Sequence, residues 1–184
     1  VMAKNQGVIT ETVSAYHNAD NMTDRFNALA TVVHHLTDKH QQEKLLHDFY
    51  DRYHDNHIIL DKWFSVQAMK PGKSGVAAVR RLMKHPDFTL RNPNRLRSVI
   101  AVFAMANPSG FNVENGAGYR LVADLVKTLD RINSQVAARL LTAFRSYKML
   151  EPNRRRMAKD ALEGIRQGDL SRDVTDILSR TLAD

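Results

Sequence analysis

Cysteine is absent from the 184-residue sequence, which excludes disulfide frameworks, thiolate zinc sites and cysteine nucleophiles. Long apolar runs are missing too, and no stretch approaches the roughly 20 residues of a membrane-spanning helix. The first residues, VMAKNQGVITETV, lack the apolar core of a signal peptide. Because Val precedes the first Met, we expect the chain to be a piece of a longer polypeptide. Because the sequence has neither a membrane-spanning stretch nor the apolar core of a signal peptide, we expect no membrane partner.

Sustained alternation of apolar and polar residues, the pattern of a half-buried strand, is also missing. Apolar residues instead recur at helical spacing, and the few proline and glycine residues (5 and 8) separate the helical stretches. One such stripe consists of Phe26, Leu29, Ala30, Val33 and Leu36, with Asn21 or Thr23 as a candidate cap. The pattern predicts about ten helices of 10–17 residues.

Such a helical array has two plausible forms, a stack of helix pairs or a compact bundle. We predict an all-α fold in which residues 1–184 form a single helical-repeat domain, a curved stack of antiparallel helix pairs of the ARM/HEAT α-solenoid type. No strict sequence period is visible, so the repeats are expected to be degenerate. Ligands of such stacks usually lie on the concave surface.

Acidic charge is scarce in the second part of the chain. Residues 1–70 carry 7 Lys+Arg and 9 Asp+Glu, whereas residues 71–184 carry 20 and 11, for a net charge of +7 overall. A basic half is typical of proteins that bind nucleic acid, an acidic protein or an anionic substrate, and it also occurs on surfaces that are merely solvated.

Catalytic motifs are missing as well. The sequence PGKSG (71–75) lacks the glycine and the preceding strand of a phosphate-binding loop, so we interpret it as a helix–helix turn. The cluster His54-Asp55-Asn56-His57, with His47 and Asp51 upstream, offers metal-ligand types, but no histidine precedes a glutamate as in the H-E-x-x-H motif of zinc peptidases. We interpret it as a polar helix end and predict no catalytic residue and no metal ligand.

Arginines are the remaining candidates. Arg95 and Arg97 follow Asn92-Pro93-Asn94 at the start of a predicted helix, where the backbone dipole disfavours cations, so a negative partner is expected nearby. Gln135 and Arg139 are four residues apart and share a face of another predicted helix. Arg97 and Arg139 flank the apolar stripes and can aim their donors into a shared groove. Surface ion pairs with Asp130 or Asp87 are the alternative. Arg154-Arg155-Arg156 are expected to be solvated.

Six blocks of the sequence together resemble the C-terminal domain of bacterial aminopeptidase N, the alanyl aminopeptidase of the gluzincin class. They keep their order and approximate spacing from Ala19 to the end of the chain. The blocks are ADNMTDR (19–25), LDKWFSVQA (60–68), HPDFTLRNPNRLRS (85–98), FAMANPSGFN (103–112), NGAGY (115–119) and SQVAARL (134–140). Members of the family often carry Pro in place of Ser134 and His in place of Asn112.

The resemblance implies a helical-repeat domain that caps the catalytic domain of a cytoplasmic zinc aminopeptidase and closes a chamber over its active site. The zinc ligands would lie upstream, so this chain would hold no cofactor. Arg97, Arg139 and Gln135 match residues that face the substrate side of the chamber. The implied partners are the upstream catalytic domain of the same polypeptide and a peptide substrate.

Two other functions stay open. A free-standing basic helical-repeat module would bind nucleic acid or an acidic protein through residues 71–184, although few aromatic residues are interleaved with the basic ones, which makes single-stranded nucleic acid unlikely. A purely structural domain would use its arginines only for contacts with the catalytic domain.

Overall fold

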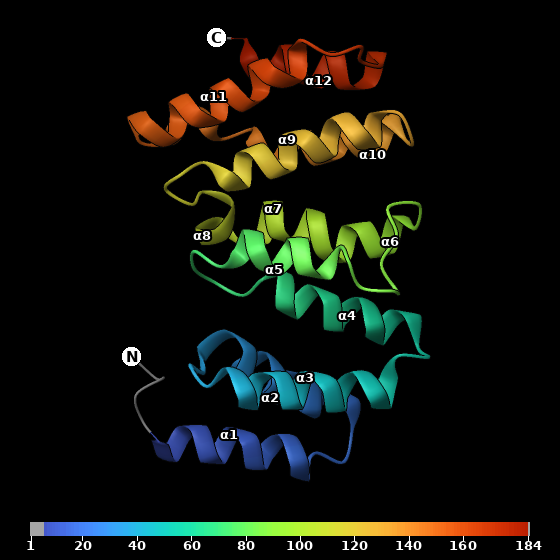
Figure 1. Ribbon diagram of the computed structural model, residues 1–184, viewed down its shortest axis with the longest axis vertical. Helices are drawn as coiled ribbons and strands as arrows, with labels where there is room; N and C mark the ends of the chain where they lie inside the picture. The colour runs from blue at the N-terminus through green and yellow to red at the C-terminus, as the bar shows by residue number, and fades with distance from the viewer. Residues whose placement is uncertain (1–5, 184) are drawn as a thin grey trace.

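A computed structural model describes residues 6–183, and this part of the chain is helical without any strand. The helices follow one another along the long axis of the molecule, from α1 at one end to α12 at the other (Figure 1). The prediction of an all-α stack of helix pairs is confirmed. The elements are α1 (Gln6–Asn18), α2 (Met22–His35), α3 (Lys39–Tyr53), α4 (His57–Ala68), α5 (Gly75–Leu82), α6 (Pro93–Leu96), a π-helical turn (Arg97–Ala101), α7 (Val102–Ala106), α8 (Pro108–Phe111), α9 (Ala117–Asp130), α10 (Ser134–Leu141), 3-10 turns at Thr142–Phe144 and Tyr147–Met149, α11 (Pro152–Arg166) and α12 (Arg172–Leu182).

Side-chain caps fix where most of these helices begin. Asn21 caps α2 by accepting a hydrogen bond from the backbone N–H of Asp24. Asp38, Asn56 and Asn133 do the same for α3, α4 and α10. Each cap satisfies a backbone donor that a helix start leaves without an intrahelical partner. The sequence therefore sets the helix boundaries through short polar residues placed just before each apolar stripe.

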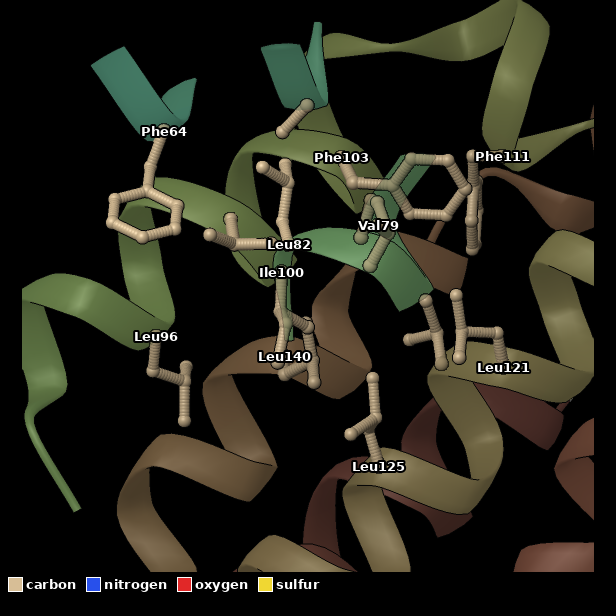
Figure 2. Close-up of a cluster of buried hydrophobic side chains, with 14 of the residues drawn as sticks. Phe64, Val79, Leu82, Leu96, Ile100, Phe103, Phe111, Leu121, Leu125 and Leu140 are labelled. Atoms are coloured by element: carbon tan, nitrogen blue, oxygen red, sulfur yellow. The ribbon is translucent and has the colours of Figure 1, made fainter. Parts of the chain in front are cut away.

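The core runs the length of the stack as one connected cluster, from Tyr16 to Leu178. Its middle part joins α4 and α5 to the helices that follow (Figure 2). Side chains from every element between α4 and α10 meet there, and all are buried: Phe64, Val79, Leu82, Leu96, Ile100, Phe103, Phe111, Leu121, Leu125 and Leu140. Burial of apolar area on this scale is the main stabilising contribution to the fold.

Asn107 connects two turns of the stack. Its buried side-chain amide donates 2.9 Å hydrogen bonds to the carbonyls of Ala68 and Lys70, at the end of α4, and its side-chain oxygen caps α8. The PGKSG segment lies beside this contact, where the N–H of Gly72 donates to the hydroxyl of Ser109. Residues 71–74 lie in the turn between α4 and α5, and Gly75 begins α5, so the segment is a helix–helix turn as the sequence predicted.

Three details differ from the sequence-based expectations. Several helices are shorter than the expected 10–17 residues, since α5 and α10 have 8 residues and α8 has 4. The helical spacing of Val136, Leu140, Phe144 and Tyr147 predicts one helix, but the α-helix ends at Leu141, and 3-10 turns carry Phe144 and Tyr147 into the core. Arg154 is not simply solvated, because its Nε donates to the carbonyl of Asn112 at 2.7 Å and so ties α11 to the end of α8.

Candidate functional site

The helix that contains Arg95 and Arg97 is continuous from Pro93 to Ala106 but is not uniform. Asn92 caps it by accepting from the N–H groups of Asn94 and Arg95. Its second turn is π-helical: the N–H of Val102 reaches back five residues to the carbonyl of Arg97. Such turns occur mostly as single insertions within α-helices and often at functional sites.

Arg95 and Arg97 have opposite environments although they share one turn. Arg95 is buried, with its guanidinium 4.7 Å from the ring centre of Phe64 and its Nη1 3.2 Å from a carboxylate oxygen of Asp61. Asp61 is thus the negative partner that was expected near Arg95, because Arg95 lies at the start of a helix. Arg97 is exposed, and its Nη1 donates to the side-chain oxygen of Asn94 at 3.1 Å.

The second group of predicted residues lies on α10. Asn133 caps this helix at its start, and the hydroxyl of Ser134 donates to Asp173 of α12 at 2.6 Å. The helix buries Ala137 and Leu140, which leaves Gln135 and Arg139 exposed on the flank of its apolar stripe. Ser134 therefore links α10 to α12 through a hydrogen bond that a proline at this position could not form.

The three predicted site residues meet in one pocket. Arg97 contributes from the π-helical turn, and Gln135 and Arg139 contribute from α10. We call this the arginine pocket. Its volume is about 200 Å³, and its apolar lining consists of Pro93, Leu96, Ala101, Met105, Val136 and Leu140. This volume is below the 300–1,000 Å³ of typical small-molecule sites, so the pocket suits one end or one side chain of a larger ligand.

The two guanidinium groups of the pocket have unused donors. Neither Arg97 nor Arg139 forms an ion pair with a carboxylate anywhere in residues 6–183. The alternative partners considered from the sequence bind elsewhere: Asp130 accepts from the backbone N–H of Ser171 at 2.8 Å, and Asp87 accepts from the hydroxyl of Tyr50 at 2.5 Å. Two permanently charged, planar donor groups beside an apolar floor suit a carboxylate or backbone carbonyls.

Met105 is a site residue that the sequence interpretation missed. It is 49% exposed, unusually for a large apolar side chain, and it lines the arginine pocket with Ala101 and Arg97. These three residues are spaced four apart, which places them on one helix face, next to the stripe of Leu96 and Ile100. The sequence could therefore have predicted, from this spacing, that Met105 lies on the same helix face as Arg97.

The histidines and acids of the described residues do not offer a metal centre. Among residues 6–183, no group of three or more His, Asp or Glu side chains is placed to share a metal ion. His47 pairs with Asp51, and His54 with Asp55, each at 3.4 Å on exposed surface. No helix in this part of the molecule is long and apolar enough to cross a bilayer.

Comparison with known proteins places the chain in a family. Residues 1–183 match the family described as "Domain of unknown function (DUF3458_C) ARM repeats". The chain is 35% identical over 169 residues to aminopeptidase N of Escherichia coli K12 and 36% identical over 170 residues to aminopeptidase N of Haemophilus influenzae. Each alignment covers 91% of this chain and 19% of the relative.

A solved structure has the same fold. It is the crystal structure of Legionella pneumophila aminopeptidase A in complex with aspartic acid, with a TM-score of 0.90 and 30% identity. The match covers 96% of this chain and 21% of that chain. The sequence thus spans about a fifth of the length of the relatives it matches.

Proposed function

The chain belongs to the DUF3458_C family of ARM-repeat domains, and from this premise we propose that it is the C-terminal domain of a zinc-dependent aminopeptidase that removes N-terminal residues from peptides. Residues 1–184 form one domain of that longer polypeptide. The zinc ion and its ligands belong to the upstream catalytic domain, as the family resemblance implies; within residues 6–183 no group of three or more His, Asp or Glu side chains is placed to share a metal ion. The enzyme acts in the cytoplasm, as the resemblance to the aminopeptidase N family implies.

In this proposal the domain caps the catalytic domain and encloses its active-site chamber. The arginine pocket forms part of the chamber wall and holds the part of the peptide that lies beyond the bond to be cleaved. Arg97 and Arg139 donate to backbone carbonyls or to the C-terminal carboxylate of the peptide, and Gln135 adds a neutral donor and acceptor. The apolar floor beside them accommodates a side chain.

One observation carries the proposal: residues from two segments about 40 positions apart, each selected by the family resemblance, converge on one small pocket and leave their charged donors without a carboxylate partner in the described chain. A surface that served only contacts with the catalytic domain would leave the same donors unpaired in this chain. Charge reversal at Arg97 separates the two, since an interface role predicts dissociation of the domains and a substrate role predicts altered substrate preference. The energetic benefit of such groups comes from a ligand that supplies the missing acceptors.

Reconstitution tests the proposal. The upstream region is produced separately, and its hydrolysis of peptides is measured with and without this chain. We expect this chain alone to bind no zinc and to be inactive, and we expect mixing to raise peptide hydrolysis, with a smaller rise for Arg97→Ala. If both pieces are folded and mixing produces neither binding nor a rise, the capping function is wrong.

The basic binding module is the alternative. It predicts an affinity for nucleic acid that falls steeply with salt concentration, because counterions are released from the phosphates. A mobility-shift titration at two salt concentrations distinguishes the two functions.

A further inference from the structure

A second, larger pocket lies between α3 and α5, beside the end of α4. Its volume is about 400 Å³, within the range of small-molecule sites. Lys39 and Glu43 reach it from α3, Lys70 from the connection after α4, and Arg81 from α5. We call it the lysine pocket. It shares no residue with the arginine pocket.

Lys70 is held in place by a buried side chain. Gln42 is only 4% exposed. Its amide nitrogen donates to the carbonyls of Leu36 and Val32 at the end of α2. This fixes the orientation of the amide and leaves its oxygen to accept from the Nζ of Lys70 at 2.5 Å. The ammonium group is therefore positioned before any ligand arrives, and it keeps further donors to spare.

The positive charges of this pocket are not neutralised within the described chain. Lys39, Lys70 and Arg81 form no ion pair with a carboxylate of residues 6–183. Burial lowers the pKa of Lys70, and the nearby charges of Arg81 and Lys39 lower it further, against a smaller opposing effect of Glu43. Three cations and one acid leave the pocket with an excess of two positive charges.

An excess of two charges matches a phosphate group better than a single carboxylate. Arg81 can donate to two phosphate oxygens at once, and the two ammonium groups act as point charges beside it. The exposed Ser74 also lines the pocket and adds a hydroxyl donor. We propose that the lysine pocket binds a small phosphate-bearing anion, with Arg81, Lys70 and Lys39 as its ligands.

Calorimetric titration of the 184-residue chain with inorganic phosphate tests this, at constant ionic strength set with chloride. We expect saturable binding of one phosphate per chain. Arg81→Gln should weaken it about ten- to a hundredfold, the usual effect of losing a hydrogen bond to a charged group. Arg80→Gln is the matched control, since Arg80 is exposed on the same helix but does not line the pocket. Lys39→Gln should weaken binding, whereas Lys44→Gln on the same helix should not.

A second measurement places the ligand. With ¹³C-labelled lysine, the NMR titration of Lys70 should shift to higher pH when phosphate saturates the chain, because a nearby anion favours the charged amine. Succinate serves as a carboxylate probe of the same charge. Binding of succinate without phosphate, no saturable binding of phosphate, or equal losses in Arg80→Gln and Arg81→Gln would each overturn the proposal.

Discussion

The guanidinium of Arg95 lies 3.2 Å from the carboxylate of Asp61, across the contact between α6 and α4. The side chain of Arg95 is 4% exposed and that of Asp61 is 25% exposed. The pair is close enough for a strong charge interaction but lacks hydrogen-bond geometry, and Nε and Nη1 of Arg95 have no other partner in the described residues. The ring of Phe64 covers the guanidinium, at 4.7 Å.

This asymmetry of burial predicts unequal costs for removing the two partners. Asp61→Ala leaves a buried arginine without its counter-charge and should lower the free energy of unfolding by about 3 kcal/mol. Arg95→Met should cost less, because the Asp61 carboxylate is partly in contact with water and methionine can pack against Phe64. Urea denaturation measures both.

Asp176→Ala is the control, because Asp176 is exposed on α12; its effect should stay within about 0.5 kcal/mol. Equal costs for Asp61→Ala and Arg95→Met would show that the pair is not buried as described.

Arg97 follows Arg95 by two residues but is exposed, so its substitution should affect peptide binding and leave stability nearly unchanged. The proposed function predicts that, in the longer polypeptide, Arg97→Ala and Arg139→Ala each lower kcat/KM for longer peptides about tenfold or more, the effect of losing a charge-assisted hydrogen bond. Amides of a single amino acid should be affected much less, since they do not reach the arginine pocket. Gln135→Ala should have a smaller effect, because its hydrogen bonds are neutral.

Stability and a neighbouring arginine supply the controls for this prediction. Arg97 and Arg139 are exposed, so their substitution should change the free energy of unfolding by less than about 0.5 kcal/mol. Arg131→Ala removes an exposed arginine outside the arginine pocket and should leave both substrate classes unchanged. Equal losses on long and short substrates for Arg97→Ala would remove the pocket from peptide binding.

Arg95 is buried and Arg97 is exposed, and this difference shows which structural features the sequence predicts and which it does not. The helices were predictable because their caps and apolar stripes are local signals, as at Asn21 and α2. The burial of Arg95 was not, because it depends on Asp61 and Phe64, more than 30 residues earlier in the chain. The two-residue spacing of Arg95 and Arg97 indicates only that their side chains point in different directions, and it does not indicate which of them is buried.

The arginine pocket required information beyond periodicity. The i, i+4 spacing of Gln135 and Arg139 placed both on one face of α10, but nothing local says that this face lies beside Arg97. The family resemblance selected the three residues, and the packing of the stack brings them together. The end of α10 at Leu141 was missed because Phe144 and Tyr147 continue the apolar spacing into 3-10 turns. The role of the pocket in peptide binding stays a prediction.

Two histidines make the stability of the chain depend on pH. Burial lowers the pKa of His34, whose Nε2 lies 2.8 Å from the carbonyl of Val66. Burial also lowers the pKa of His85, with a further decrease from Arg95 and an opposing effect of Asp87. As the pH falls through the ordinary value of 6.5, the unfolded chain binds protons that the folded chain does not, so the free energy of unfolding falls.

Urea denaturation at pH 7.5, 6.5 and 5.5 measures this effect. The double variant His34→Gln, His85→Gln should lose less stability between pH 7.5 and 5.5 than the parent chain, whereas His57→Gln, at an exposed position, should keep the parent slope. Asp48 does not interfere, because the hydrogen bond from Arg52 lowers the pKa of its carboxyl below 3.8, outside this window. An unchanged slope in the double variant would contradict the assignment.

Two glycines in helices predict opposite effects of the same substitution. A Cβ at Gly118 of α9 would lie 2.2 Å from the carbonyl oxygen of Phe111, so α8 and α9 approach each other at a distance that only glycine permits. Gly118→Ala must displace backbone and should destabilise the chain by about 3 kcal/mol, the upper part of the range for overpacking. A Cβ at Gly164 of α11 would meet nothing within 4 Å, so Gly164→Ala should stabilise by roughly 0.5–1 kcal/mol through higher helix propensity. Thermal unfolding of the two variants is compared with that of the parent chain. A neutral Gly118→Ala would mean that the packing of α8 on α9 differs from the one described, and a destabilising Gly164→Ala would mean that the space around Gly164 on α11 is not open.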